Sequence, residues 1–439
     1  MHGHTDVSDG VLRPAVAFRH ARDVAKVDFL CLSEHNHDIQ TNTTQAGLTE
    51  VDAASKAITG TAFVGLMGQE FSTISNGNHI NVYDVATQIP TNFLNDYKAL
   101  FEEFLPQYQQ AHPDRIVVAQ FNHPEDDQKD YGRVPYTIKR DNVTNTIRNY
   151  NGDAQAFRAG ADRWVRTIAI LSGPADVTQK NETNLPFNEH RDIDSRRVSI
   201  WFRYLDMGMH LSPVADQDNH SQSWGNRTAA RTGVWVQGAW TRDSLLSAIK
   251  ANRTFASEDA NLSVWFTLNG QPMGSRLTPA QAGAHLNVQV IARDANETNV
   301  SYAFELYREI VGDGERPEPV EKSGLIANGA AWAVQVDPEE TERYAYFVKA
   351  TQFRPGSDPR DEAYTAPIWI GPAPAAPGIS EAGHEGTAVA ATTKFVGSRN
   401  SDVYHFPECS LVPGIRDRGN LVEFADKPPG RHLHKGCPR

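Results

Sequence analysis

The chain opens with two histidines separated by one residue, His2 and His4, and Asp9 follows five residues later. In an extended segment, residues i and i+2 point to the same side, so both imidazoles can reach one ion. Imidazole nitrogens and carboxylate oxygens are common ligands of zinc, manganese and iron. This spacing indicates a metal site at the start of the chain, although such a pair alone is also typical of a tag remnant.

Several apolar runs farther along the chain end in an imidazole or a carboxylate, or carry one. These residues are Glu34 with His35, Glu70, His79, His123, and Asp218 with His220. In a parallel barrel, the carboxyl ends of the strands converge on one face, where active sites lie. Each residue taken singly is better explained as a surface or hydrogen-bonded side chain, but the joint pattern favours metal ligands.

We therefore expect nine side chains to meet at that face: His2, His4, Asp9, His35, Glu70, His79, His123, Asp218 and His220. Nine ligands are too many for one ion and suit two or three ions, with a carboxylate shared between two of them. Cys31 lies within an apolar run, so we interpret it as core packing and not as a nucleophile.

Short apolar runs alternate with amphipathic stretches over residues 1–257. Strands are expected at 28–32, 62–67, 79–83, 116–121, 167–171 and 211–215, and helices at 14–26, 92–111, 198–207 and 241–251. Pro14 suits a first helical turn, and Thr241 suits an N-cap. Strands that alternate with helices predict an α/β sheet or barrel.

The pattern changes over residues 258–371, where short alternating strands are separated by turn signals such as Asn269-Gly270. The expected strands are 262–268, 286–292, 302–306, 331–336 and 344–351, which predict a small β-sandwich that supports the first domain. Residues 372–393 are rich in Pro, Ala and Gly and are expected to form a linker, and residues 394–439 form a third, short unit.

Composition limits the possible functions. The net charge of −12 argues against nucleic-acid binding by the whole chain, and three cysteines are too few for a disulfide scaffold. No apolar run reaches the ~20 residues that span a bilayer, and no signal peptide is visible. The chain begins inside its first motif, so we expect a preceding strand outside it, and the compartment, cytoplasmic or exported, stays open.

The motifs together resemble those of the PHP superfamily, named for polymerase and histidinol phosphatase. Its hallmarks stand here as residues 2–10, Glu34-His35, Gly68-Gln69-Glu70, His123-Pro124 and Asp218-Asn219-His220. The segment 231–257 also resembles the closing strand and helix of that family. The chain departs from the family pattern at Glu34, where Asp is usual, at 215–217, where Gly-Gly-Ser is common, and in the additional imidazole of His37.

The resemblance implies a distorted (β/α)7 barrel with a trinuclear site of zinc, manganese or iron ions. By position, the first ion would be held by His2, His4, Glu70 and Asp218. Glu70 would bridge to a second ion, which His79 and His123 would also bind. Asp9, His35 and His220 would hold a third ion.

The resemblance also implies a hydrolase that uses metal-bound hydroxide, in which Glu70 and Asp218 serve catalysis as ligands. His37, which the family pattern lacks, is a candidate proton donor in its own right. His210 and Arg19 are weaker candidates for protonating a leaving group or binding an anion. Most such enzymes cleave phosphate esters, so a small phosphate ester or a nucleotide is the leading substrate. Residues 28–37 and 68–72 resemble the carbaryl-hydrolase branch, which leaves a carbamate or carboxylic ester as the alternative. A non-catalytic binding protein with a degenerate barrel is a further alternative.

The C-terminal unit contains two pairs of soft ligands, His405 with Cys409 and His434 with Cys437. Such pairs suit a tetrahedral structural zinc, which would stabilise a unit too small for a large core. The segment resembles the metal-binding module of the Ada DNA-repair protein, with His405 and His434 in place of two cysteines. Eight basic against five acidic residues over 394–439 hint at weak nucleic-acid contact.

Overall fold

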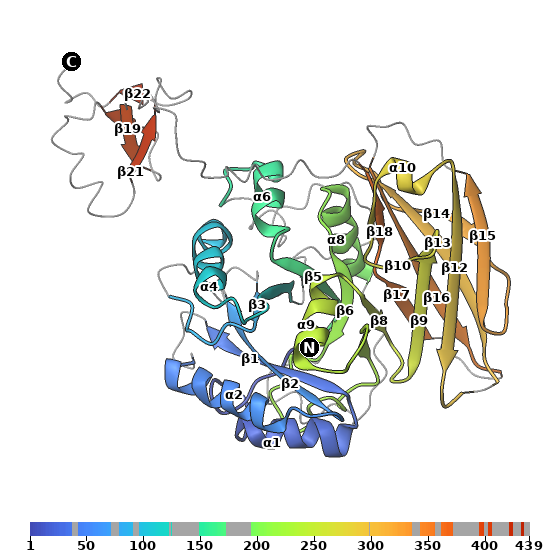
Figure 1. The fold of residues 1–439 in the computed structure, drawn as a ribbon, viewed down its shortest axis with the longest axis horizontal. Helices are drawn as coiled ribbons and strands as arrows, with labels where there is room; N and C mark the ends of the chain where they lie inside the picture. The colour runs from blue at the N-terminus through green and yellow to red at the C-terminus, as the bar shows by residue number, and fades with distance from the viewer. Residues whose placement is uncertain are drawn as a thin grey trace. The chain divides into compact units, whose positions relative to one another are not determined.

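The structure is a computed structural model that describes residues 1–36, 43–71, 79–90, 96–122, 124, 149–172, 195–297, 299–335, 343–355 and 361–371, together with the backbone of four short strands within 395–433. The chain divides into two compact units, Met1–Ala373 and Pro374–Arg439. The first unit mixes helices and sheets, so the expected α/β class is confirmed (Figure 1).

A curled, six-stranded sheet forms half of a barrel in the N-terminal part of the first unit (Figure 1). Its strands, in spatial order, are β1 (Phe29–Asn36), β2 (Val64–Phe71), β3 (Ile80–Tyr83), β4 (Val118–Phe121), β5 (Val165–Ser172) and β6 (Ser212–Asp216). All six coincide with expected strands. β3 is antiparallel to both neighbours, whereas the other neighbours are parallel. The nearly continuous burial of β1, β2, β4 and β6 explains their uninterrupted apolar runs.

Helices cover this sheet and connect its strands. They are α1 (Pro14–His20) with η1 (Ala21–Ala25), α2 (Gln45–Ile58), α3 (Tyr97–Ala99) with η4 (Leu100–Phe104) and α4 (Leu105–Ala111), α6 (Ala154–Ala161), α8 (Ser195–Asp206) and α9 (Arg242–Lys250). Figure 1 shows α1 and α2 together beneath β1 and β2. The Thr241 side chain accepts from Ser244 N in a capping box, so the expected N-cap of α9 is confirmed.

Among the described helices that cover this sheet, α2 and α6 are absent from the sequence expectation. The buried stripe of α2 consists of Leu48, Val51 and Ser55, which is too short and too polar to stand out as a helical period. α6 spans only two turns and buries Phe157 beside small residues.

The second half of the first unit is a β-sandwich, as expected. One sheet has the order β10 (Gln271–Pro272), β9 (Leu262–Leu268), β12 (His285–Asp294), β15 (Gly329–Gln335). The other has the order β11 (Arg276–Leu277), β18 (Ile368–Ile370), β16 (Tyr344–Phe353), β17 (Asp361–Thr365), β8 (Thr254–Ser257), β7 (Arg231–Val234), with β13 (Ser301–Ile310) paired to β16 and β14 (Glu318–Lys322) paired to β13. The short helix α10 (Pro279–Ala282) follows β11. Alternating burial along β9 and β12 places every second side chain in the core between the sheets.

β7 and β8 connect the two halves of this unit. The resemblance assigns this segment to the closing strand and helix of the family. Both strands pair within the sandwich sheet, where Ser257 is opposite Ala363 of β17, and Thr254 of β8 also bonds to Ser212 of β6 at 2.7 Å. Helix α8 packs across the same junction, with the Trp201 ring 4.8 Å from that of Phe347. The sandwich therefore supports the half-barrel through a shared hydrophobic core.

The second unit contains β19 (Phe395–Ser398), β20 (Val403–His405), β21 (Leu421–Phe424) and β22 (His432–Leu433), in the order β21-β19-β20-β22. Cys409, His434 and Cys437 lie outside the described residues, and only the backbone of His405 is described. The structural zinc therefore stays a prediction. In the described part of the chain, no helix has the length and apolar character to cross a membrane.

Candidate metal centre

The candidate ligands reach one edge of the six-stranded sheet from several parts of the chain. β1 and β2 are parallel and end at this edge, with His35 opposite Glu70 in their register. Because β3 runs in the opposite direction, His79, which directly precedes it, lies at the same edge. Asp218 and His220 follow β6, and the N-terminal segment supplies the remaining ligands.

The N-terminal segment lies between β1 and the segment that follows β6. Ser33 N donates to Gly3 O at 3.0 Å, and His4 N donates to Asn219 O at 2.8 Å. Gly3 and Asn219 form a parallel bridge. These bonds place the side chains of His2 and His4 on the same side, with their Nε2 atoms 3.0 Å apart, as the His-x-His spacing predicts.

His2, His4, Glu70 and Asp218 form a buried group around one point. His2 Nε2 lies 3.3 Å from Glu70 Oε2 and 3.2 Å from Asp218 Oδ1. His4 Nε2 lies 3.4 Å and 2.9 Å from the same two oxygens. Ligand atoms bonded at ~2.0–2.2 Å to one ion are about 2.8–3.6 Å apart for six to four ligands. These four side chains therefore fit a single divalent ion.

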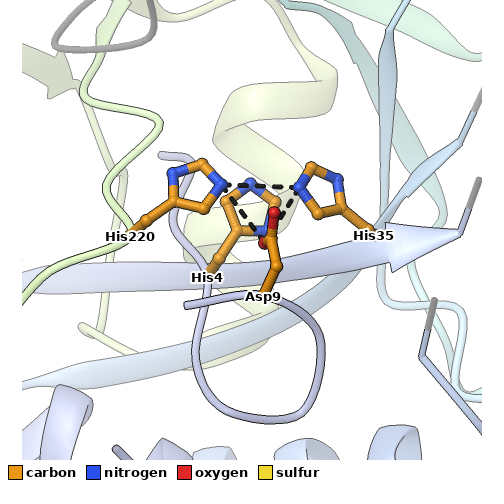
Figure 2. A group of neighbouring side chains, drawn as sticks. All are labelled: His4, Asp9, His35 and His220. Carbon is orange, nitrogen blue, oxygen red and sulfur yellow. Dashed lines mark hydrogen bonds and ion pairs between the residues drawn. The ribbon is translucent and has the colours of Figure 1, made fainter. Parts of the chain in front are cut away.

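A second group, shown in Figure 2, contains Asp9, His35 and His220 beside His4. Asp9 Oδ1 lies 3.1 Å from His35 Nε2 and 3.3 Å from His220 Nε2, and the two nitrogens are 3.4 Å apart. The ring of His4 stacks on both other imidazoles, with centroid separations of 4.0 and 4.2 Å. The three atoms of this triangle again have the spacing of ligands around one ion.

Glu70 joins the two groups. Its Oε2 atom, which faces His2 and His4, also lies 2.9 Å from His35 Nδ1. Its Oε1 atom lies 3.0 Å from His79 Nδ1 and accepts from Asn122 Nδ2 at 2.9 Å. A fully buried carboxylate with imidazoles on both oxygens has the position that a bridging ligand requires.

Two residues predicted for this centre, His37 and His123, lie outside the described residues, so their roles stay predictions. His210 precedes β6 and therefore lies toward the opposite edge of the sheet, where its Nδ1 is 2.6 Å from Asp162 Oδ2. The structure does not bring His210 to the centre. Arg19 is exposed on α1.

Glu34, which ends an apolar run and departs from the family pattern, has a structural role that the sequence did not reveal. Its buried carboxylate accepts from Thr5 N at 3.1 Å, from Thr5 Oγ1 at 2.6 Å and from Ser8 Oγ at 2.6 Å. These bonds fix the loop between His4 and Asp9. The two hydroxyl residues of the opening motif were the available signal, because buried hydroxyls need an acceptor.

Further contacts orient His2 and His220 through their Nδ1 atoms, which point away from the ligand groups. Asp216 Oδ2 lies 3.8 Å from His2 Nδ1 and accepts from Gln120 Nε2 at 2.9 Å. His220 Nδ1 lies 2.9 Å from the Asp218 carbonyl oxygen, which can only accept a hydrogen bond, so Nδ1 carries the proton and donates. This bond leaves the Nε2 lone pair of His220 for the side facing Asp9 and His35, which is the tautomer that a metal ligand needs.

The imidazoles and carboxylates of the centre shift one another's pKa. Burial acts to lower the pKa of His2, but Glu70 and Asp218 outweigh it and raise that pKa well above its usual value. Burial likewise acts to lower the pKa of His35, yet Asp9 and Glu70 raise it to about 9. Burial acts to raise the pKa of Asp218, whereas the nearby imidazoles hold it well below its usual value. Protons on the imidazoles thus balance charge that divalent cations would also balance.

The donor set suits transition metals, because it combines imidazole nitrogens with carboxylate oxygens. His4 Nδ1 is buried and has no hydrogen-bond partner among the described residues. The expectation of buried groups able to hold metal ions is confirmed. The number and identity of the ions stay predictions.

The chain matches no protein-family model, and no curated protein matches it either. Its activity must therefore be inferred from its own residues.

Proposed function

We propose that the chain is a metal-dependent hydrolase with a centre of two or three divalent ions. The observation that carries this proposal is the pair of adjacent ligand groups joined by Glu70. Burying several imidazoles and carboxylates together costs stability unless their charges are neutralised. The two groups lie at the carboxyl edge of a sheet, which is where enzymes of this architecture have their reactive groups.

We also propose that residues 1–257 belong to the PHP superfamily. The first group contains the four residues that the resemblance assigns to one ion, and the second contains the three assigned to another. The curled half-barrel sheet is compatible with a distorted barrel. The N-terminal segment, which bridges β1 to the segment after β6, brings the two ends of that sheet together.

Divalent ions bound here would lower the pKa of a water molecule toward ~7 and supply Lewis acidity to an ester substrate. The side chains contribute binding and orientation. Glu70 and Asp218 act as ligands whose positions are set by the imidazoles around them. Glu34 keeps the loop that carries Asp9 in place through Thr5 and Ser8. His37 is proposed as a proton donor to the leaving group.

A phosphate ester, such as a nucleotide, is our first choice of substrate, in line with most members of the superfamily. A carbamate or carboxylic ester is the second candidate. It is favoured by the resemblance of residues 28–37 and 68–72 to the carbaryl-hydrolase branch, since residues 29–36 form β1 and residues 68–71 end β2, and these strands carry His35 and Glu70 to the centre.

The test is a turnover assay on protein loaded with manganese or zinc, offered phosphate esters in one arm and an aryl carbamate and an aryl ester in the other. Asp218→Asn and His220→Ala are compared with His285→Ala, which removes an exposed imidazole on β12. The proposal predicts that hydrolysis is lost in the first two variants and kept in the third. Hydrolysis that survives both ligand changes would refute the ligand assignment. A metal-loaded protein without turnover on any substrate would favour a binding protein.

For the second unit, we propose one structural zinc held by His405, Cys409, His434 and Cys437, and weak nucleic-acid contact through its excess of basic residues. The support is the spacing of the two ligand pairs in the sequence. Zinc content is measured in the full chain and in Cys409→Ser with Cys437→Ser. The proposal predicts one fewer zinc per chain in the variant, and an unchanged zinc content would refute it.

A further inference from the structure

Three carboxylates meet at the junction between the half-barrel and the sandwich, apart from the metal centre. Asp206 is the last residue of α8, Glu309 lies in β13, and Asp313 lies in the turn that follows β13. One carboxylate oxygen from each residue lies within 4.8 Å of the others. We propose that these three residues form a calcium site that joins helix α8 to the β13 strand.

Glu309 is the most informative member. Only 1 % of its surface is exposed, and neither carboxylate oxygen has a hydrogen-bond partner among the described residues. Among the described residues, no Lys, Arg or His forms an ion pair with any of the three carboxylates, although the Arg203 charge acts to lower the pKa of Asp206. A buried carboxylate without a partner costs several kcal/mol unless it is neutralised. Glu309 therefore requires a cation or a proton.

Packing does not explain why a carboxylate stands at position 309 of β13. Residues i and i+2 of a strand share a face, so Glu309 lies on the same face of β13 as Tyr307. Tyr307 stacks on Phe347 at 5.2 Å and approaches the Phe202 ring of α8 at 6.5 Å. An apolar side chain would suit this face against α8, whereas a carboxylate there points directly at the end of the helix.

The two aspartates are held so that each keeps one oxygen for a ligand. Asp206 Oδ1 accepts from Gly312 N at 2.8 Å and from Gly314 N at 3.2 Å, which fixes the turn that carries Asp313. Asp313 Oδ1 accepts from Glu315 N at 2.9 Å. The C-terminal end of α8 carries partial negative charge, which opposes a carboxylate at Asp206 and favours a cation beside it.

The chemistry of the donors selects a hard cation. All three side chains offer oxygen only, and Ca²⁺ accepts oxygen ligands at ~2.3–2.6 Å, so ligands on opposite sides are about 4.6–5.2 Å apart. One oxygen from each residue lies within 4.8 Å of the others, a spacing that a Ca²⁺ cage can accommodate. Burial also raises the pKa of Glu309 to about 9 and raises that of Asp206, so without a cation a proton is held at neutral pH.

The experiment is a calcium titration of full-length protein already loaded with zinc, followed by calorimetry and by thermal unfolding. Glu309→Gln keeps the shape of the side chain, and Asp313→Asn changes an exposed residue, so at least one variant should fold. Asp294→Asn is the matched control. Asp294 belongs to another acidic group, in which the Arg354 guanidinium lies 3.0 Å from Asp259.

We expect one saturable Ca²⁺ per chain that raises the unfolding temperature of the wild type, and affinity at least tenfold weaker in Glu309→Gln and Asp313→Asn. Asp294→Asn should bind as the wild type does, and Mg²⁺ should bind more weakly than Ca²⁺. Calcium binding that is absent from the wild type, or equal in all variants, would overturn the site. In that case Glu309 is simply a protonated carboxyl, and Glu309→Gln would leave the unfolding temperature unchanged or higher.

Discussion

Metal binding at the second ligand group should compete with protons, and His35 determines the size of this competition. Its pKa of about 9 means that the ring carries a proton at pH 7 in metal-free protein. An imidazole binds a metal ion through an unprotonated ring nitrogen, so metal binding at His35 must displace that proton. Two pH units below the pKa, this competition weakens metal affinity by about 100-fold, or ~2.7 kcal/mol.

Raising the pH from 7 to 8 should therefore strengthen binding at this group by about tenfold and release about one proton per ion. The raised pKa of His2 adds the same trend to the first group. Affinity is measured by competition with a fluorescent chelator calibrated at each pH. Calorimetry in two buffers with different ionisation enthalpies counts the protons released.

His35→Gln is the informative variant, because it removes the titrating ring and keeps a polar side chain. We expect it to bind one fewer ion, to release one fewer proton, and to show a shallower pH dependence. His285→Gln, at the exposed imidazole on β12, should leave all three quantities unchanged. Metal affinity that stays constant from pH 7 to pH 9, without proton release, would refute this account of the centre.

Three further predictions concern the protein without bound metal. Glu34→Ala should lower the free energy of unfolding by about 2–4 kcal/mol in urea denaturation, because three donors from Thr5 and Ser8 lose their acceptor; a change below ~0.5 kcal/mol would contradict the proposed role. The pKa of His35 is higher in the folded state than its unfolded value of ~6.5, so stability should fall as pH rises from ~6.5 to ~9, by at most about 3 kcal/mol, and a rise over that window would have the wrong sign. Trp201→Ala should cost about 3–5 kcal/mol, since this ring is fully buried between the half-barrel and the sandwich, and independent melting of the two halves in calorimetry would contradict that coupling.

The strands were predictable because they are buried, apolar and bounded by polar residues. All six strands of the half-barrel coincide with apolar runs, and strands β9 and β12 of the sandwich alternate as expected, whereas β14, β17 and β18 were not expected. Helix α9 was predictable from Thr241, whose hydroxyl caps it. Helix α2 was not, because Ser55 occupies part of its buried stripe and weakens the helical period.

Two features of the topology were harder to predict. The direction of β3 follows from the short connection between Phe71 and Ile80, since a parallel crossover needs about a dozen residues or more. That signal was present in the sequence. The pairing of β8 with β17 joins residues near 257 and 363, and no local pattern specifies a partner so distant along the chain.

The candidate centre was predictable in its ligands but not in its supports. His2 and His4 were marked by their spacing, and Glu70 by its place at the end of an apolar run. Glu34 and Asn122 are ordinary polar residues in sequence, and their contacts with the opening loop and with Glu70 depend on the folded sheet.

The most direct test of the central claim is a stoichiometric metal titration of metal-free protein, with hydrolysis followed at each addition. The account predicts that activity on a phosphate ester, or on a carbamate or carboxylic ester, appears only on metal addition and saturates at two or three manganese or zinc ions per chain, once any zinc bound by residues 394–439 is subtracted. Asp218→Asn should bind fewer ions and remain inactive at saturation. Hydrolysis by metal-free protein, or full activity in Asp218→Asn, would contradict it.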